Sequence, residues 1–315
     1  MGDLALLKSK AGGWAKGYGY HMIAILTVIV WGTTFVSTKV LISYGLSPAD
    51  ILFYRFVLAY IGIWFVSPKT LWAKSWKDEL LLVASGLCGG SLYFIAENSA
   101  LGITLASNVS LLICTTPILT AFLTFIIYKG EHLKSTLIYG SIIALLGVAL
   151  VVFNGGFILR INPLGDLLTL IAALLWAFYG IILRRLDKHY STLFITRKVF
   201  FYGIVTLLPF FYFEPLNTDV EVLTTPLVLS NLIYLGLVAS MFCYIMWNLT
   251  ISKLGVVRTT NYIYVIPLVT LITSALIINE KITGIALLGS VFILGGVYLA
   301  EKGFSFLSHR YFHKQ

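Results

Sequence analysis

The chain has 315 residues, of which 59% are hydrophobic and 11% are charged, and its formal net charge is +9 at pH 7. Since an average soluble domain carries about 25% charged residues, a chain this apolar could not cover its own surface in water. The composition excludes a soluble globular protein and predicts a chain embedded in lipid.

Ten apolar stretches follow one another along the sequence. A helix of about 20 residues crosses a hydrocarbon core of roughly 30 Å. Breaks at Gly, Pro, Asn and charge clusters give predicted spans at 20–43, 49–67, 80–101, 105–128, 135–153, 166–184, 194–213, 226–251, 258–279 and 282–301. We therefore predict an all-α membrane protein with ten transmembrane helices, a cytoplasmic segment at 1–21 and a basic cytoplasmic tail at 302–315.

The basic residues predict the orientation. If the N-terminus is cytoplasmic, 18 of the 22 Lys and Arg residues fall in the N-terminal segment, in the cytoplasmic loops and the adjoining ends of the spans, or in the tail, as the positive-inside rule requires. Arg160 and Lys281 fall outside, and Lys39 and Arg55 lie within spans. The positive charge thus indicates orientation and attraction to the membrane surface. We expect the lipid bilayer as a partner, and no nucleic acid.

The two halves resemble each other at an offset of about 150 residues. TTPILTAFLTFIIYKGEHL at 115–133 aligns with VIPLVTLITSALIINEKIT at 265–283, and WGTTFVSTK at 31–39 aligns with WAFYGIILR at 176–184. Each half then holds five spans, and an odd number makes the second half cross the membrane in the opposite sense. Inverted repeats of this kind are typical of secondary transporters, whose substrate lies between the halves.

Prolines and glycines also recur in both halves. Pro117 and Pro267 lie inside the fourth and ninth spans, where each removes a backbone hydrogen bond and is expected to kink its helix. They serve either as hinges or as packing elements. Glycines spaced seven residues apart, which allow close helix contact within or between chains, are Gly140 and Gly147 in the fifth span and Gly289 and Gly296 in the tenth.

Three charged residues lie within spans at similar depth. Glu97 is the only acidic residue more than two residues from the end of a predicted span, and Lys39 and Arg55 are the cations nearest to its level. One interpretation is an ion-pair cluster that fixes helix packing. In the second, two cations against one anion favour a carboxylate substrate, which the Arg fork would hold. In the third, Glu97 takes up and releases a proton during the cycle.

The remaining polar and aromatic residues of the spans are expected to face the protein interior, because lipid offers them no partners. On the eighth span, Tyr244, Trp247 and Asn248 cluster. For any single Trp or Tyr the alternative is packing or interfacial anchoring, but the matched pairs Trp31/Trp176 and Asn98/Asn248 favour a cavity. The predicted substrate-binding residues are Trp31, Thr34, Thr38, Tyr93, Glu97, Asn98, Asn108, Trp176, Tyr179, Trp247, Asn248, Asn261 and Tyr264.

Several of these features together resemble a known family. They are the W-x-x-x-F start, the Arg of the second span, the PILTAF…GE and IPLVTL…NE segments, and the closing LLGSVFILGGVYL. Their order and duplication are similar to the EamA-type branch of the drug/metabolite transporter superfamily, with repeats at 22–153 and 165–301. The resemblance implies two inverted five-helix repeats, a central cavity and alternating access for small metabolites, often amino acids leaving a bacterial cell. Glu97 departs from the aromatic or small residue more usual there.

Motifs for other chemistry are missing from the sequence. There is no HExxH, no GxSxG and no phosphate-binding loop, so we expect neither an enzyme, nor a metal or cofactor, nor an ATP-driven motor. We predict a secondary transporter that moves an amino acid or related zwitterion across the cell (inner) membrane, with efflux as the expected direction. The alternatives are a carrier of phosphorylated sugars or nucleotide sugars and a structural or sensing membrane protein. The coupling ion and the oligomeric state stay open.

Overall fold

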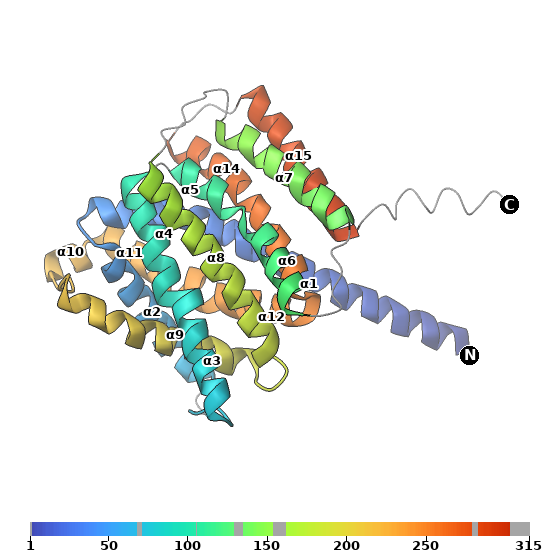
Figure 1. Ribbon diagram of the computed structural model, residues 1–315, viewed down its shortest axis with the longest axis horizontal. Coiled ribbons are helices and arrows are strands. Elements are labelled where there is room, and N and C mark those ends of the chain that lie inside the picture. The colour runs from blue at the N-terminus through green and yellow to red at the C-terminus, as the bar shows by residue number, and fades with distance from the viewer. Residues whose placement is uncertain are drawn as a thin grey trace.

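A computed structural model describes residues 2–67, 71–104, 106–128, 135–153, 162–278 and 283–302. These residues form helices and no strands (Figure 1), so the predicted all-α class is confirmed. The first half contains α1 (Gly2–Ser43), α2 (Pro48–Val66), α3 (Trp76–Gly86), η1 (Leu87–Ser91), α4 (Leu92–Ile103), α5 (Ala106–Ile113), α6 (Thr116–Ile127) and α7 (Ser135–Phe153).

The second half contains more short segments. They are α8 (Pro163–Leu186), α9 (Thr192–Leu207), η2 (Leu208–Tyr212), α10 (Val220–Thr224), α11 (Pro226–Ile233), η3 (Tyr234–Phe242), α12 (Cys243–Leu254), α13 (Val256–Thr260), η4 (Asn261–Val265), α14 (Ile266–Ile278) and α15 (Gly284–Lys302). Both η1 and η3 are π-helical, whereas η2 and η4 are 3₁₀ helices.

Seven helical segments of the described chain are long and apolar enough to cross a membrane. They are Tyr18–Ser43, Pro48–Val66, Trp76–Ile103, Val109–Ile127, Pro163–Leu186, Thr192–Tyr212 and Pro226–Leu254, and each overlaps a span predicted from the sequence. The shorter apolar helices Ser135–Val151 and Gly284–Ala300 coincide with the predicted fifth and tenth spans. The ninth predicted span is divided among α13, η4 and α14.

Capping side chains fix where helices begin. At the start of α2, Ser47 and Asp50 exchange hydrogen bonds with each other's backbone N–H, and Pro48 occupies the first turn, which is the capping-box arrangement. The second carboxylate oxygen of Asp50 accepts from the backbone of Asn217 at 2.9 Å. One acidic residue therefore caps a helix of the first half and holds the loop after η2 against it.

The two halves are interleaved rather than separate. Helix α4 packs against α8, α2 against η3 and α9, α1 against α12 and α14, and α6 against α8. The continuous hydrophobic core accordingly draws on both halves. Any space enclosed at the centre of the bundle is bounded by both halves of the sequence.

Helices α7 and α15 lie side by side along one flank of the bundle (Figure 1). Their contact depends on the four glycines predicted to allow close approach, and it is formed within the chain. A Cβ atom at Gly296 would lie 2.4 Å from the backbone nitrogen of Ala144 and 2.6 Å from the carbonyl oxygen of Gly140. A Cβ atom at Gly147 would lie 2.6 Å from the carbonyl oxygen of Gly289.

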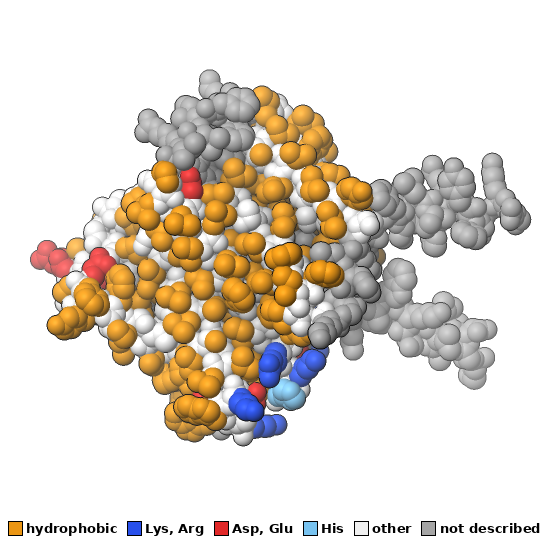
Figure 2. Space-filling view, viewed as in Figure 1, with side chains coloured by type: hydrophobic (Ala, Val, Ile, Leu, Met, Phe, Trp, Pro, Cys, Tyr) orange, Lys and Arg blue, Asp and Glu red, His pale blue; other side chains and the backbone are white. Residues whose placement is uncertain are grey.

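Large apolar side chains cover the outside of the bundle. Phe122, Leu146, Leu164 and Leu287 are each more than half exposed. The visible face in Figure 2 is mostly hydrophobic, with basic side chains gathered at one end, near the turn between α8 and α9. An apolar belt between charged ends is the surface expected of a membrane protein.

Replacing Gly296 by Ala should separate α7 from α15. The added methyl group meets backbone atoms that cannot rotate away, and overpacking of this kind costs about 1–3 kcal/mol. The measurement is the thermal unfolding temperature of the purified protein in detergent. The matched control is Gly295→Ala, because a Cβ atom there meets nothing within 4 Å. Equal unfolding temperatures for the two variants would contradict the proposed contact.

Candidate functional site

A small cavity lies at the centre of the bundle, between the two halves. Its volume is about 40 Å³. It is lined by Trp31, Thr34 and Phe35 of α1, Arg55 of α2, Tyr93, Phe94 and Glu97 of α4, Ile113 of α5, Thr116 of α6, Trp176 of α8, Tyr244 of α12, Ile263 of η4 and Ile266 of α14.

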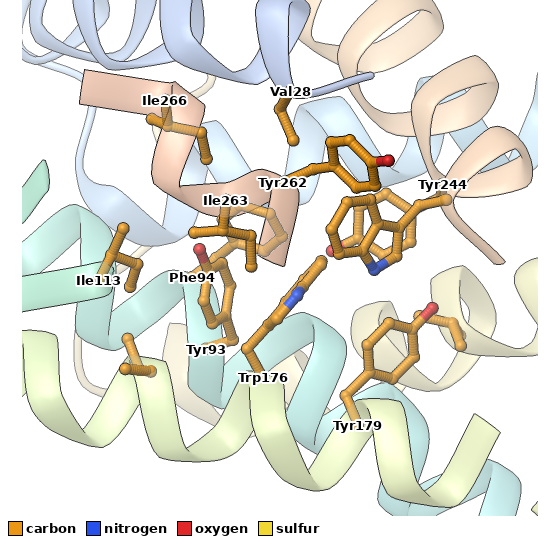
Figure 3. Packing of buried hydrophobic residues seen from close by; sticks show 14 of the residues in the cluster. Val28, Tyr93, Phe94, Ile113, Trp176, Tyr179, Tyr244, Tyr262, Ile263 and Ile266 are labelled. Atoms are coloured by element: carbon orange, nitrogen blue, oxygen red, sulfur yellow. The ribbon is translucent and has the colours of Figure 1, made fainter. Parts of the chain in front are cut away.

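Aromatic rings form one wall of the cavity. The ring centroids of Trp31 and Trp176 are 5.3 Å apart and nearly perpendicular, and Tyr244 lies 6.0 Å from Trp31 and 5.7 Å from Trp176. Edge-to-face arrangements at these distances are favourable. Figure 3 shows Trp176 and Tyr179 projecting from α8, with Ile263 and Ile266 opposite them. The predicted pair Trp31/Trp176 is thus in direct contact.

One cation and one carboxylate face this cavity. The Nε of Arg55 donates to the Oγ of Ser240 at 2.9 Å, and its guanidinium lies 4.2 Å from the centre of the Phe94 ring. The hydroxyl of Tyr93 donates to the Oε1 of Glu97 at 2.7 Å. Within the described part of the chain, no ion pair of 4.0 Å or less joins Arg55 to Glu97. Both charged side chains therefore contact neutral groups, Ser240 and Phe94 for Arg55 and Tyr93 for Glu97, and not each other.

The third intramembrane charge lies elsewhere. Lys39 is exposed on α1 and does not line the cavity. Of the three residues that the sequence placed at one depth, the structure brings together Arg55 and Glu97. Within the described lining of the cavity there is consequently one positive and one negative side chain.

Two π-helical segments flank the aromatic wall. In η3, the carbonyl oxygen of Ala239 accepts from the indole N–H of Trp31 at 2.9 Å. In η1, the carbonyl oxygen of Gly89 accepts from the hydroxyl of Tyr244 at 2.6 Å. Gly89 and Ala239 are 150 residues apart, the same offset as Asn98 and Asn248. Each half therefore offers a π-helical carbonyl to an aromatic side chain of the other half.

A glycine is required at the first of these positions. A Cβ atom at Gly89 would lie 2.5 Å from the ring of Tyr179. The neighbouring Gly90 has a backbone conformation outside the helical region, with φ −135° and ψ −107°. Gly89 therefore allows α8 to approach the π-helical segment closely. Neither π-helical segment was predicted from the sequence, although the glycine pair at 89–90 was a signal for one of them.

Two predicted cavity residues bind each other beside the aromatic wall instead of lining the space. The hydroxyl of Tyr179 donates to the Oδ1 of Asn248 at 2.9 Å, and the Nδ2 of Asn248 donates to Thr196 at 2.8 Å. The matching Asn98 donates through its Nδ2 to the carbonyl of Pro48 at 3.4 Å. The two asparagines are thus in different surroundings, and both are buried.

The other predicted residues are distributed around this centre. Trp247 packs 4.9 Å from Trp31, and Thr38 is buried on α1. Asn261 and Tyr264 are buried in η4 and have polar side-chain atoms with no hydrogen-bond partner among the described residues. Asn108 belongs to α5, and its side chain is outside what the structure describes.

The two prolines occupy equivalent positions. Pro117 is the second residue of α6, directly after the turn at Cys114 and Thr115, and Pro267 is the second residue of α14, directly after η4. The regular helix is therefore interrupted just before each proline, as expected from the missing N–H. Thr116 and Ile266, the residues before the prolines, line the cavity.

A second buried charge cluster was not expected from the sequence. Glu79 of α3 forms an ion pair with Lys198 of α9 and accepts a hydrogen bond from the hydroxyl of Tyr202. The predicted third span began at residue 80, which assigned Glu79 to a loop. In the structure α3 begins at Trp76, so Glu79 is already inside the bundle.

Comparison with known proteins identifies the family. The profile of the EamA-like transporter family matches residues 19–153 and again residues 163–301, which together make up most of the chain. The chain belongs to the EamA-like transporter family. It is therefore a membrane transporter of the drug/metabolite type and not an enzyme, as the sequence predicted.

Individual relatives share about a quarter of the sequence with this EamA-like protein. A "Probable amino-acid metabolite efflux pump" of Escherichia coli is 28% identical, covering 90% of this chain and 94% of its own length. A "Probable terminal-alkyne amino-acid exporter" of Streptantibioticus cattleyicolor is 25% identical, covering 88% and 92% respectively. An "Uncharacterized transporter" of Archaeoglobus fulgidus is 28% identical, covering 89% and 96%.

A solved crystal structure has the same fold. It is 19% identical, covers 93% of this EamA-like chain and 99% of its own, and superposes with a TM-score of 0.71. At this level of identity the similarity supports the arrangement of the helices alone.

Replacing Tyr244 by Phe should destabilise the transporter. The substitution removes the hydrogen bond that the hydroxyl donates to the buried carbonyl oxygen of Gly89, which costs about 0.5–1.5 kcal/mol. Thermal unfolding of the purified protein measures the effect, with Tyr139→Phe as the control, because Tyr139 is 58% exposed. If both variants unfold at the wild-type temperature, the hydroxyl of Tyr244 does not support the π-helical segment.

Proposed function

We propose that this protein is a secondary transporter of an amino acid or a related zwitterion and works by alternating access. The proposal is carried by one observation: Arg55 and Glu97 line the same cavity without forming an ion pair with each other. A guanidinium is suited to a carboxylate, to which it can donate two parallel hydrogen bonds. Glu97 would receive the ammonium group of the same substrate.

The aromatic wall would receive the substrate's side chain. Trp31, Trp176 and Tyr244 present apolar ring surface next to the two charged groups. Small-molecule sites commonly combine an apolar lining with a few polar groups that fix orientation. The names of the relatives from Escherichia coli and Streptantibioticus cattleyicolor support the same substrate class.

The volume of the cavity supports a change of conformation during transport. A cavity of about 40 Å³ has room for about three water molecules, at 10–15 Å³ each, which is less than an amino acid needs. A substrate could enter only after the two halves move apart on one side. In the proposed cycle the conformation described here is the closed state between the two open ones.

We further propose the topology of the chain. Ten transmembrane helices would form two inverted five-helix repeats at 22–153 and 165–301, with both termini in the cytoplasm and the transporter in the cell (inner) membrane. The recurrence of π-helical carbonyls at Gly89 and Ala239 supports the repeat. The interruptions before Pro117 and Pro267 would act as hinges, and efflux would be the direction of transport.

The second candidate substrate class is phosphorylated sugars. A phosphate monoester carries up to two negative charges and is usually held by several cations. With Lys39 exposed, Arg55 is the only Lys or Arg among the residues that line the described cavity, and Glu97 would repel a phosphate. The charges of the site therefore favour a zwitterion.

Replacing Glu97 by Gln should reduce transport of amino acids. A lost hydrogen bond to a charged group is worth about 1.5–3 kcal/mol, or a decrease of about tenfold or more in affinity. The measurement is counterflow of radiolabelled amino acids in proteoliposomes, with and without a proton gradient. The control variant is Glu221→Gln, because Glu221 is exposed on α10.

Comparing transport with and without the proton gradient distinguishes two roles of Glu97. Loss of counterflow itself supports the role in holding the ammonium group. Loss of gradient-driven accumulation with intact counterflow would instead make Glu97 the site that carries the proton. Uptake that is unchanged in both assays would give Glu97 a packing role and contradict the proposed site.

Replacing Arg55 by Gln should abolish recognition of the substrate carboxylate. Amino acids should then lose at least about tenfold in counterflow rate, since a charge-assisted contact is removed, whereas the corresponding amines, which lack the carboxylate, should compete equally with wild type and variant. Lys253→Gln is the matched control, because Lys253 is exposed at the end of α12. Equal loss for amino acids and amines would contradict this role of Arg55.

A further inference from the structure

A second cavity opens at the end of the bundle where basic residues gather. It has a volume of about 200 Å³, larger than the central cavity. Its lining comes from α2, from the segment before α3 and from α9. Among the lining residues are Tyr60, Trp64, Leu71, Trp72, Arg197 and Lys198. No residue of this cavity lines the central one.

Two neighbouring cations face this cavity. The amino group of Lys198 forms an ion pair with Glu79 and lies 4.6 Å from the centre of the Trp72 ring. Arg197 donates through one terminal nitrogen to the carbonyl oxygen of Ser67. In the described structure, the pair of cations is balanced by the single carboxylate of Glu79, which leaves one positive charge.

The other terminal nitrogen of Arg197, its Nη2, differs from the first in having no acceptor in the described structure. The side chain is 2% exposed, and its Nη2 has no hydrogen-bond partner among the described residues. An unpaired buried guanidinium nitrogen is costly, because its desolvation is not compensated. The structure thus contains a buried guanidinium nitrogen without an acceptor, on a side chain that lines a cavity with two cations in its wall.

The surroundings identify the type of anion. Trp72 is 68% exposed and Trp64 is 37% exposed, as is typical of indole rings at a membrane–water interface. Basic residues of the connections near this end, among them Lys74, Lys77 and Lys188, are also exposed. Basic pockets between helices at this level of a membrane bind the phosphate of lipid head groups.

We propose that Arg197 and Lys198 form a binding site for a phosphate group, supplied by the phosphodiester of an anionic phospholipid or by free inorganic phosphate. The Nη2 of Arg197 donates to a phosphate oxygen, and Lys198 contributes charge while it stays paired with Glu79. The rings of Trp64 and Trp72 border the head group. The site is separate from the cavity proposed for transport, and it does not depend on which substrate is carried.

The test compares lipid binding by the full-length wild type and two variants. Native mass spectrometry of the detergent-purified protein counts bound phosphatidylglycerol against phosphatidylcholine, whose ammonium group offsets its phosphate. Wild type should prefer phosphatidylglycerol, and Arg197→Gln should lower this binding about tenfold, as loss of a hydrogen bond to a charged group implies. The control variant Lys77→Gln removes the same charge from an exposed position outside the cavity and should bind like wild type.

A second variant keeps the test decisive if Arg197→Gln does not fold. Leu71→Glu places a carboxylate in the wall of the cavity at a residue that is 53% exposed, so the fold should tolerate it, and it should lower binding of phosphatidylglycerol equally. The thermal unfolding temperature in the presence of inorganic phosphate distinguishes the source of the anion. An increase in wild type that is absent from the folded variants, without a preference for phosphatidylglycerol, identifies free phosphate as the ligand.

The proposal is overturned by one clear result. If Leu71→Glu and any folded Arg197→Gln protein retain phosphatidylglycerol and respond to inorganic phosphate like wild type, the cavity binds no phosphate group. Loss of binding together with unchanged amino-acid counterflow supports the site and separates it from the transport cavity.

Discussion

A backbone carbonyl that leaves the regular α-helical pattern inside a membrane has no water to bind, so it needs a donor from the protein itself. Two carbonyls of π-helical segments, at Gly89 in η1 and Ala239 in η3, accept hydrogen bonds from the side chains of Tyr244 and Trp31. In each case the carbonyl and the donor belong to opposite halves of the chain. The need to satisfy these two groups therefore joins the halves at the centre of the bundle.

The same hydrogen bonds between the two halves position the aromatic wall of the cavity. The indole of Trp31 and the ring of Tyr244 are held in place by their hydrogen bonds, and Trp176 packs edge-to-face against both. Arg55 also joins the two halves, because its Nε donates a hydrogen bond to Ser240 of η3. A movement that separates the halves must break or exchange these bonds, and π-helical segments of this kind are frequent at functional sites. The residues of the proposed binding site would therefore also be the residues whose hydrogen bonds change in the proposed movement.

Particular residues show which features of the structure could be predicted from the sequence. The apolar stretches and the glycines at 140, 147, 289 and 296 are local or periodic features, and the structure has helices and a close α7–α15 contact where they were expected. The order of motifs was enough for the family, which the two profile matches confirm. Lys39 shows the limit: its depth along α1 resembled that of Glu97, but depth does not give the direction of a side chain around its helix, and Lys39 is exposed.

Hydrophobicity and repeat spacing act along the chain, so they were enough to predict the helical class, the positions of the apolar segments and the membership of a transporter family. Only the tertiary structure decided that Arg55 and Glu97 share a cavity, that Asn248 binds Tyr179 beside it, and that Glu79 pairs with Lys198. Each of these facts depends on the rotation of one helix against another. In a bundle surrounded by lipid, that rotation depends on which polar groups can find partners in helices far away in the sequence.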